Sequence, residues 1–207
     1  MEPIAEAREP GGQAGGVPDK RGTRRAILAV AQELFAAQGY AGTSVADIAN
    51  RLGMSKAALY YHFRSKTDIL RALLEEPVAA YSRLAGSAAA GQLGAQDLLG
   101  AVIDTTADLH ALVDVIGNDP SARSALQDLL PRSREINEAI TAALAGPRPD
   151  PAGIIRAHAA YGAAKNGTLA LLAARGGHLT QHDRAELLAA AERALTAGAP
   201  AAAKDKE

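Results

Sequence analysis

In Thr43-Ser-Val-Ala-Asp-Ile-Ala-Asn-Arg-Leu-Gly-Met-Ser-Lys-Ala-Ala-Leu-Tyr-Tyr-His-Phe63, two short helical patterns lie on either side of one glycine. Gly53 suits the left-handed backbone conformation that commonly ends a helix, so it separates the two patterns. The second pattern is too polar and aromatic on one side to be buried all round, whereas the first has an apolar face that would hold it in place. The stretch therefore predicts a helix-turn-helix, a motif whose second helix enters the major groove of DNA.

The flanking sequence extends this motif in both directions. Upstream, apolar residues recur at helical spacing and predict a helix over 23–38 that Gly39 ends. Ser44 and the acidic residue three positions later form the pattern of a capping box for the next helix. Downstream, Ser65 caps a fourth helix, which we expect to be interrupted or kinked near Pro77.

The remainder of the chain also has helical patterns and no alternating runs typical of strands. Glycine and proline clusters divide it into five expected helices, at about 95–116, 121–130, 132–145, 152–175 and 181–196. We therefore predict an all-α protein of about nine helices. Its expected parts are a flexible arm at 1–19, a three-helix helix-turn-helix domain at 20–66, a second helical domain at 67–198 and a frayed tail at 199–207.

Charge divides the chain in a similar way. The formal net charge is −1, but the block from Lys20 to Glu75 holds nine basic and four acidic residues. This block carries +5, so the remainder carries −6. A small basic module joined to a larger acidic one fits DNA at one end and a different partner at the other.

Several classes of function lack their usual residues. No apolar run approaches the roughly 18 residues of a membrane span, and 1–17 lacks the apolar core of a signal peptide, so we expect a cytoplasmic protein without membrane contact. The absence of cysteine removes disulfides and thiolate chemistry. No catalytic motif is present, and His178 and His182 flank a helix cap with no third ligand nearby. We therefore predict no enzymatic activity, no cofactor and no metal.

The N-terminal block resembles the DNA-binding domain of the TetR family of bacterial transcriptional regulators over about fifty residues, a quarter of the chain. The matching residues are Arg25, Ile27-Leu28, Ala31, Leu34-Phe35, Gly39-Tyr40, Thr43-Ser44-Val45, Asp47-Ile48-Ala49, Gly53, Ser55-Lys56, Leu59-Tyr60-Tyr61-His62-Phe63, Ser65-Lys66 and Leu70. In that family the C-terminal helices bind a small ligand and dimerise. The resemblance implies the same two roles for residues 67–198.

The third helix supplies the candidate DNA contacts. A helix in the major groove needs small residues with hydrogen-bonding tips beside them, and Ser55, Lys56 and Ala57 provide that combination. The resemblance implies that Lys56, Tyr60 and Tyr61 meet phosphates or base edges. It also implies phosphate anchoring by Thr43 and Ser44, and backbone contacts by His62 and Lys66; Arg24 belongs to a basic run that would lie along phosphates. The alternatives are that one tyrosine caps a small core and that Lys56 is a solvated charge.

Few residues of the third helix are suited to recognise a particular DNA sequence. No Asn, Gln or Arg lies on the third helix to form a bidentate pair with adenine or guanine. We expect specificity to depend on few contacts, on thymine methyl groups meeting Ala57 or Ala58, and on DNA shape. Because one short helix contacts few base pairs, a two-fold dimer on a palindromic operator is expected.

The resemblance implies that the last two long helices, 152–175 and 181–196, form the dimer interface. Small and apolar residues recur along both at helical spacing, in agreement with that role. They are Ala157, Ala160, Ala164, Gly167, Leu171, Leu187, Leu188, Ala191 and Leu195. The alternative is that these stripes form the core of a single chain, as in any helical bundle.

The ligand pocket is expected among the helices before this interface, where polar residues lie within apolar stretches. The candidates are His110, Asp114, His158, Tyr161, Lys165 and Asn166. For the two histidines the alternative is a hydrogen-bonded core residue. The chain has only two phenylalanines and five tyrosines, so an aromatic cage for a large cation is not expected. An aliphatic or weakly polar ligand fits better.

These observations predict a homodimeric DNA-binding transcriptional regulator, a repressor that a small-molecule effector releases from its operator. Two alternatives remain open. One is a DNA-bound structural or cell-division protein that uses the same module without a ligand, which predicts no enclosed pocket in the second half. The other is an enzyme or ligand carrier in which the motif is incidental, which predicts no salt-dependent affinity for DNA.

Overall fold

The computed structural model describes residues 19–198, without the side chains of 111, 113–118 and 130. Within this range it contains α-helices and one 3₁₀ turn but no strand, which confirms the all-α prediction. The elements are α1 (Lys20–Gly42), α2 (Val45–Arg51), α3 (Lys56–His62), α4 (Lys66–Ala89), α5 (Ala95–Asn118), α6 (Pro120–Ala125), η1 (Gln127–Leu129), α7 (Leu130–Ala145), α8 (Pro151–Ala174) and α9 (Gln181–Thr196). The expected arm at 1–19, apart from Asp19, and the expected tail at 199–207 lie outside the described residues.

The first four helices follow the predicted caps closely. Ser44 and Asp47 form the capping box of α2, and the hydroxyls of Ser55 and Ser65 cap α3 and α4. Gly39 has a φ of 76°, so α1 kinks there, but helical turns resume and continue to Gly42. The regular helix therefore ends at Gly39 as expected, and a short helical turn follows it within the bounds of α1.

The expected interruption at Pro77 is wrong, because α4 is one continuous helix that contains this proline. Its two halves are buried in different clusters of apolar residues, Leu73 in the first and Leu84 in the second. Proline removes one backbone hydrogen bond from a helix. Burial on both sides of Pro77 holds the helix together in spite of that loss.

The segment between α5 and α7 also differs from the prediction. The expected helix over 121–130 is shorter: α6 ends at Ala125, and the 3₁₀ turn η1 follows it. The expected break at Pro131 is absent, because this proline occupies the first turn of α7. At that position a missing N–H costs nothing, since the first N–H groups of a helix have no partner within it.

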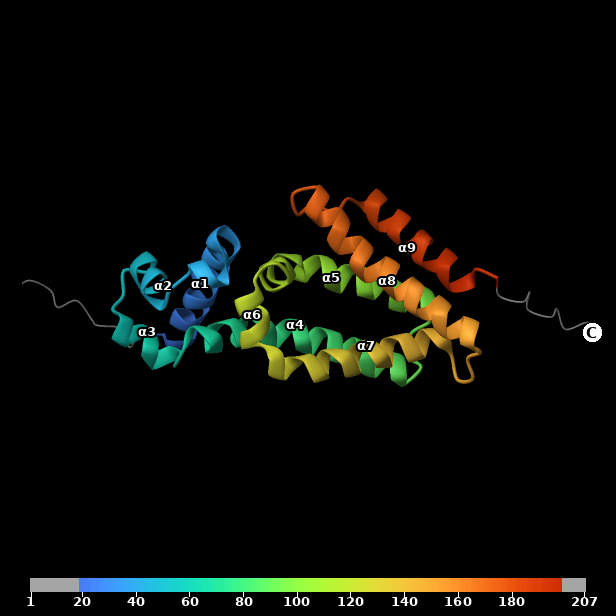
Figure 1. Ribbon diagram of the computed structural model, residues 1–207, viewed down its shortest axis with the longest axis horizontal. Helices are drawn as coiled ribbons and strands as arrows, with labels where there is room; N and C mark the ends of the chain where they lie inside the picture. Colours follow the sequence, from blue (N-terminus) through green and yellow to red (C-terminus); the bar gives the residue numbers. More distant parts are fainter. Residues whose placement is uncertain (1–18, 199–207) are drawn as a thin grey trace, which may run out of the picture.

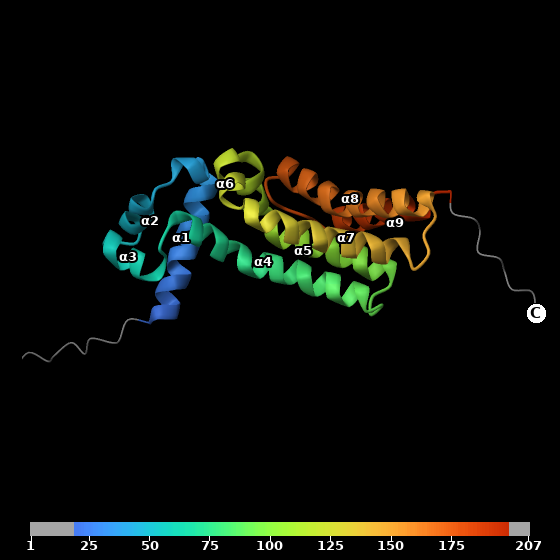
Figure 2. The same cartoon turned by 60° about the horizontal axis from the view of Figure 1, so that its bottom comes forward.

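The helices form an elongated molecule with a small module at one end (Figure 1). Helices α1–α3 make this module, and α4 leads from it along α7 into a bundle that α5, α8 and α9 complete (Figures 1 and 2). Helix α8 packs against α5, α7 and α9 of the same chain. Between residues 19 and 198, no helix combines the length and the apolar character that a membrane crossing requires.

Two apolar clusters hold the molecule together. The first lies in the α1–α4 module and includes Phe35, Ile48 and Leu59, but it also takes in Leu112 from α5 and Leu126 from the turn after α6. The second fills the bundle. The module is thus packed directly onto the second half of the chain and is not merely tethered to it.

Candidate nucleic-acid interface and ligand pocket

Helix α3 has one buried side and one exposed side. Leu59 is 0% exposed and Phe63, its C-cap, is 4% exposed, so these two residues anchor the helix in the first cluster. Tyr60 and Tyr61 are 49% and 68% exposed. Neither tyrosine therefore caps the core, which contradicts that alternative. Lys56 and Ala57 in the first turn are exposed as well, so the combination expected of a groove-binding helix lies on the surface.

A lysine from α1 joins this surface. The Lys20 Nζ lies 5.1 Å from the centre of the Tyr61 ring, and its hydrogen bond to Tyr61 raises the pKa of the ammonium group. The rings of Tyr61 and His62 meet edge-on with centroids 5.4 Å apart. Lys20 was missed as an individual site residue, although its basic run was noted. Only the fold brings the first residue of α1 to the end of α3.

Two serines mark the exposed N-termini of the motif helices. The Ser44 hydroxyl accepts a hydrogen bond from the Asp47 N–H at 3.1 Å, and the Ser55 hydroxyl accepts one from the Ala58 N–H at 3.1 Å. Both serines remain exposed. Their hydroxyl protons are still available to an acceptor outside the protein, as the prediction requires.

Thr43 and Lys66 have internal roles, which corrects two predicted DNA contacts. Thr43 is 2% exposed, and its hydroxyl donates to the Gly39 carbonyl at 2.8 Å. The Lys66 Nζ donates to the carbonyls of Tyr40 and Thr43 at 2.6 and 2.8 Å and lies 4.1 Å from the centre of the Tyr40 ring. Burial lowers the pKa of Lys66. This lysine holds the end of α1 against the start of α4, and two of its three N–H donors are used within the protein.

Arg24 is also largely committed within the module. Its guanidinium carbon lies 4.8 Å from the centre of the Phe63 ring, and a terminal nitrogen lies 3.9 Å from a Glu75 carboxylate oxygen. The side chain remains 42% exposed. Arg24 therefore packs α1 against α3 and α4, and it is a weaker candidate for phosphate contact than Lys20.

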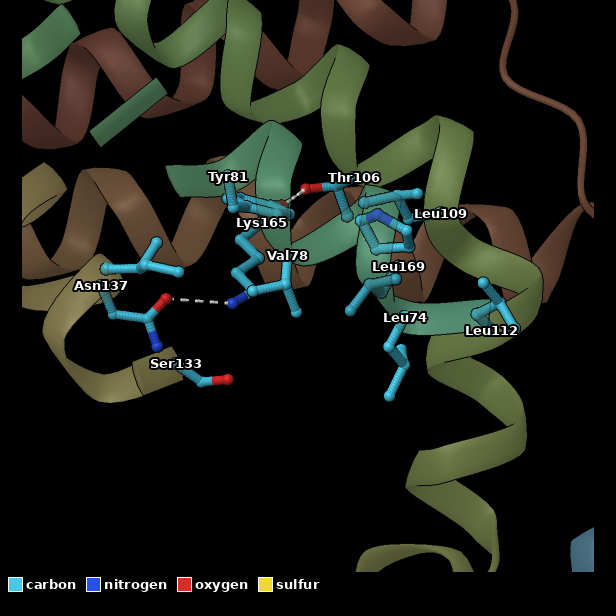
Figure 3. A pocket seen from close by; sticks show the side chains of 12 residues that line it. Leu74, Val78, Tyr81, Thr106, Leu109, Leu112, Ser133, Asn137, Lys165 and Leu169 are labelled. Atoms are coloured by element: carbon cyan, nitrogen blue, oxygen red, sulfur yellow. Dashed lines mark hydrogen bonds between the residues drawn. The ribbon is translucent and has the colours of Figure 1, made fainter. Parts of the chain in front are cut away.

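A cavity of about 120 Å³ lies between α4, α5, α7 and α8. Its wall is mostly apolar, with one polar side (Figure 3). The lining residues of most interest are Leu74, Val78, Leu109, Leu112, Asn137 and Lys165. The cavity is partly open to the surface, so it does not by itself exclude the alternative of a DNA-bound structural protein without a ligand.

Of the six predicted pocket residues, one lines this cavity and a second bonds to a lining residue. Lys165 lines it, and Tyr161 stands beside it, donating to the Asn137 Oδ1 at 2.6 Å. Burial raises the pKa of the Tyr161 phenol. Asn137 was not predicted, and no periodic signal marked it; it becomes part of the site because α7 packs against α8.

The other predicted pocket residues lie elsewhere. His110 bonds to the Ala107 carbonyl of its own helix at 2.9 Å and faces Gly177 in the turn between α8 and α9. His158 and Asn166 are exposed on α8, with His158 at a separate surface depression. These three are corrections, because each points away from the cavity. The side chain of Asp114 lies outside the described residues.

The predicted interface seam is mostly internal. Ala157, Ala160, Ala164 and Ala191 are 0% exposed and belong to the second apolar cluster of this chain. A Cβ on Gly167 would come within 3.1 Å of a Leu187 methyl group, so α8 and α9 approach each other closely there. Leu171, Leu188 and Leu195 are half-buried. The prediction that the four alanines form the dimer interface is therefore corrected: they belong to the core of this chain. A residue without exposed surface cannot contact a second chain.

A different face of α8 is open. Ile154 and Ile155 are 45% and 69% exposed, and they are the large aliphatic residues most exposed among those described. Along the helix, Ala159, Asn166 and Ala170 follow Ile155 at helical spacing and are also exposed. A strip of exposed residues, apolar at its start and small at the alanines but interrupted by the polar Asn166, thus lies on the outside of the bundle.

One carboxylate joins the motif module to the second half. The Asp119 Oδ2 accepts from the Ala41 N–H at 2.6 Å, while its Oδ1 accepts from the N–H groups of Ser121 and Ala122 at 2.8 and 3.3 Å. An Asp before a proline is a local cap pattern, but no local pattern marks the bond to Ala41, 78 positions away. These bonds, led by the one to Ala41, lower the pKa of Asp119.

No group of three or more potential metal ligands is found among the described side chains.

The chain matches known proteins most clearly in its motif module. Residues 27–73 match the family model described as "Bacterial regulatory proteins, tetR family". The chain is 42% identical over 53 residues to the helix-turn-helix-type transcriptional regulator AcrR of Shigella flexneri, which is 26% of this chain and 25% of that protein. It is 35% identical over 118 residues to the transcriptional repressor KstR2 of Mycobacterium tuberculosis, covering 55% of this chain and 57% of the repressor. The chain thus spans a quarter to somewhat more than half of these relatives.

Solved structures extend the likeness to the whole fold. The structure described as a SmeT–triclosan complex superposes with a TM-score of 0.65 at 20% identity, and the match covers 90% of this chain and 98% of SmeT. At this identity the likeness concerns the fold alone. It nonetheless includes both the motif module and the helical bundle.

Proposed function

We propose that this chain, which belongs to the TetR family of bacterial regulatory proteins, is a DNA-binding transcriptional regulator whose α3 enters the major groove. The observation that carries the proposal is the exposed side of α3, where Tyr60 and Tyr61 stand 49% and 68% exposed above the buried Leu59. Large aromatic side chains on a monomer surface mark binding sites when they gather with charge. Lys20 and Lys56 supply that positive charge here.

Action as a repressor is the form of regulation that its relatives favour, since KstR2 is named a transcriptional repressor. The proposal assigns the chain no catalytic role and places it in the cytoplasm, where the chromosomal operator is found. The α3 surface of one chain covers few base pairs, so two chains would bind the half-sites of a palindrome.

The exposed strip on α8 is the surface we propose for this dimer. Ile154 and Ile155 provide apolar anchors, and the alanines that follow would let a second helix approach closely. A two-fold axis would pair the strip with its own copy. This proposal moves the interface from the buried alanines to the opposite side of the same helix.

The cavity is the site we propose for the effector. Leu112 lines the cavity and also belongs to the apolar cluster of the motif module. A ligand that displaces Leu112 would shift the end of α5, and with it Asp119 and its bond to Ala41. The orientation of the two α3 helices in the dimer would then change, so that they no longer match successive major grooves.

DNA binding is tested by sequencing the DNA that the purified protein selects and then measuring gel shifts on that DNA. Lys56→Ala should weaken binding and reduce the slope of log affinity against log salt by about 1, because one phosphate contact is lost. Tyr60→Phe should weaken binding by loss of one hydroxyl contact. Arg148→Ala is the matched control, since Arg148 is an exposed basic residue in the loop between α7 and α8, at the other end of the molecule. If both α3 variants bound every DNA as well as the control, the proposed role of α3 would be refuted.

A further inference from the structure

Lys165 is a cation held within the cavity without a carboxylate. Its Nζ lies 3.2 Å from the Asn137 Oδ1, and 5.2 and 5.5 Å from the ring centres of Tyr81 and Tyr161. Among the described side chains, no Asp or Glu forms an ion pair with it. A half-buried ammonium group is costly unless an anion compensates it, and burial accordingly lowers the pKa of Lys165.

The hydrogen bonds around Lys165 leave donors facing the cavity. The Asn137 Oδ1 already accepts from both Tyr161 and Lys165, which fixes the orientation of the amide. The Asn137 amide nitrogen is then directed toward Ser133 (Figure 3). Lys165, Asn137 and Ser133 can therefore all donate hydrogen bonds at one side of the cavity, where a ligand with acceptor atoms would be satisfied.

The opposite side of the cavity is mostly apolar, and the Thr106 hydroxyl beside it is already bonded to the Tyr81 hydroxyl and the Val102 carbonyl. Figure 3 shows Leu74, Leu109, Leu112 and Leu169 gathered there, away from Asn137 and Ser133. A ligand that fills the whole cavity must present an apolar body to the leucines. The volume of about 120 Å³ is close to that of engineered apolar cavities that hold a benzene-sized molecule, roughly 150 Å³.

We infer that the effector is a small monocarboxylate with an apolar body, whose carboxylate pairs with Lys165 and accepts from Asn137 while its body lies among the leucines. This inference rests on the proposed function, since it names the chemical class of ligand for the same cavity. A carboxylate matches the donors better than an alcohol because a charge-assisted hydrogen bond is roughly twice as strong as a neutral one. An amine is disfavoured because it would place a second cation beside the first.

The binding test uses purified full-length protein without DNA and isothermal titration calorimetry. The probes are hexanoate, octanoate and benzoate, each compared with the alcohol and the amine of the same carbon skeleton. We expect at least one acid to bind at least about tenfold more tightly than its alcohol, and its amine to bind least well. If no acid binds, or if an alcohol or amine binds as tightly as its acid, the inference is overturned.

Two variants locate the effect at Lys165. Lys165→Met keeps the length of the side chain but removes the charge, so it should abolish the preference for the acid while leaving binding of the alcohol unchanged. Asn137→Asp places a carboxylate next to Lys165 and should have the same effect by occupying the lysine. Lys165→Arg keeps the charge and should retain the preference. A thermal melt of each variant shows that it is folded, and an undiminished preference for the acid in folded Lys165→Met overturns the inference.

A gel shift on the selected DNA separates this inference from the proposed function. If the acid binds through Lys165 and also releases the DNA, both are supported. If it binds through Lys165 without releasing DNA, the ligand class stands and the proposed release mechanism fails. If the protein binds no DNA at all, the proposed function fails while the calorimetric result still decides the ligand class.

Discussion

Replacing Asp119 by alanine tests whether the second half of the chain is fastened to the DNA-binding module by one carboxylate. Asp119 caps α6 through Ser121 and Ala122 and also accepts from the Ala41 N–H at 2.6 Å. The chain provides a matched control in Asp150, which likewise precedes a proline and caps α8 by accepting from the Gly153 N–H. Asp150 bonds to no residue of the α1–α4 module. The two substitutions therefore differ mainly in the bond to Ala41.

The expected magnitudes follow from these contacts. Loss of an N-cap costs about 1 kcal/mol. The ion pair of Asp150 with Arg156, at 3.6 Å and exposed at Asp150, adds little to this, so about 1 kcal/mol is expected for Asp150→Ala. Asp119→Ala also loses a charge-assisted bond, worth about 1–2 kcal/mol, because Ala41 lies at the surface and water replaces part of the bond. The total for Asp119→Ala is about 2–3 kcal/mol, which lowers the melting temperature by roughly 4–12 °C, against roughly 2–4 °C for the control.

Urea denaturation followed by circular dichroism measures the two free energies of unfolding. Hydrogen exchange adds a local measurement, because the amide of Ala41 should exchange faster in Asp119→Ala and at the wild-type rate in Asp150→Ala. Equal destabilisation by the two substitutions, together with unchanged exchange at residues 39–42, would refute the idea that this bond fastens the module.

The pH dependence of stability provides a second test of the bond between Asp119 and Ala41. The three N–H groups favour the charged carboxylate and lower the pKa of Asp119 below its ordinary value of 3.8. The resulting stabilisation is complete above pH 3.8 and is lost as the pH falls through the lowered pKa. The difference in stability between wild type and Asp119→Ala should therefore shrink below that pH, and a difference that grew in acid would contradict the assignment.

Three further predictions concern the module and the dimer. Lys66→Met should destabilise the protein by about 1–3 kcal/mol, because two carbonyls lose a charged donor, and urea denaturation would show whether Lys66 is structural as described. Ile155→Glu should turn the dimer into a monomer in sedimentation experiments, whereas Ala89→Glu, an exposed position near the end of α4, should not; a persistent Ile155→Glu dimer would place the interface elsewhere. Lys20→Met should weaken DNA binding and lower its salt dependence at unchanged thermal stability, and unaltered gel shifts would remove Lys20 from the DNA-binding surface.

Local patterns predicted the helices well because the responsible interactions span three or four residues. The capping box of Ser44 with Asp47 and the cap by Ser65 both form as expected. The two clear errors of helix assignment involve prolines. Pro77 continues a helix because buried residues on both sides hold it, and Pro131 begins a helix where it was expected to break one.

The sequence predicted the placement of some site residues correctly and that of others wrongly, depending on where their contacts are made. The exposed face of α3 follows from its own sequence, because a polar and aromatic side of a short helix has nowhere to be buried. Lys66 turned inward because its partners, the carbonyls of Tyr40 and Thr43, lie at the end of α1, whereas Thr43 turned inward toward Gly39 of the helix that it caps. Helical spacing alone does not distinguish a side chain that stays on the surface from one that bonds within the protein.

The sequence by itself determined that this protein is all-helical and carries a helix-turn-helix, because periodicity, glycine turns and caps act within a few residues of chain. Only the tertiary structure decided which stripe of α8 is core and which is surface, since an apolar stripe packs equally well against its own chain or another. It also decided that Lys165 meets Asn137 beside a cavity and that Asp119 holds Ala41. These contacts join residues far apart in the chain, and they exist only once the helices have packed.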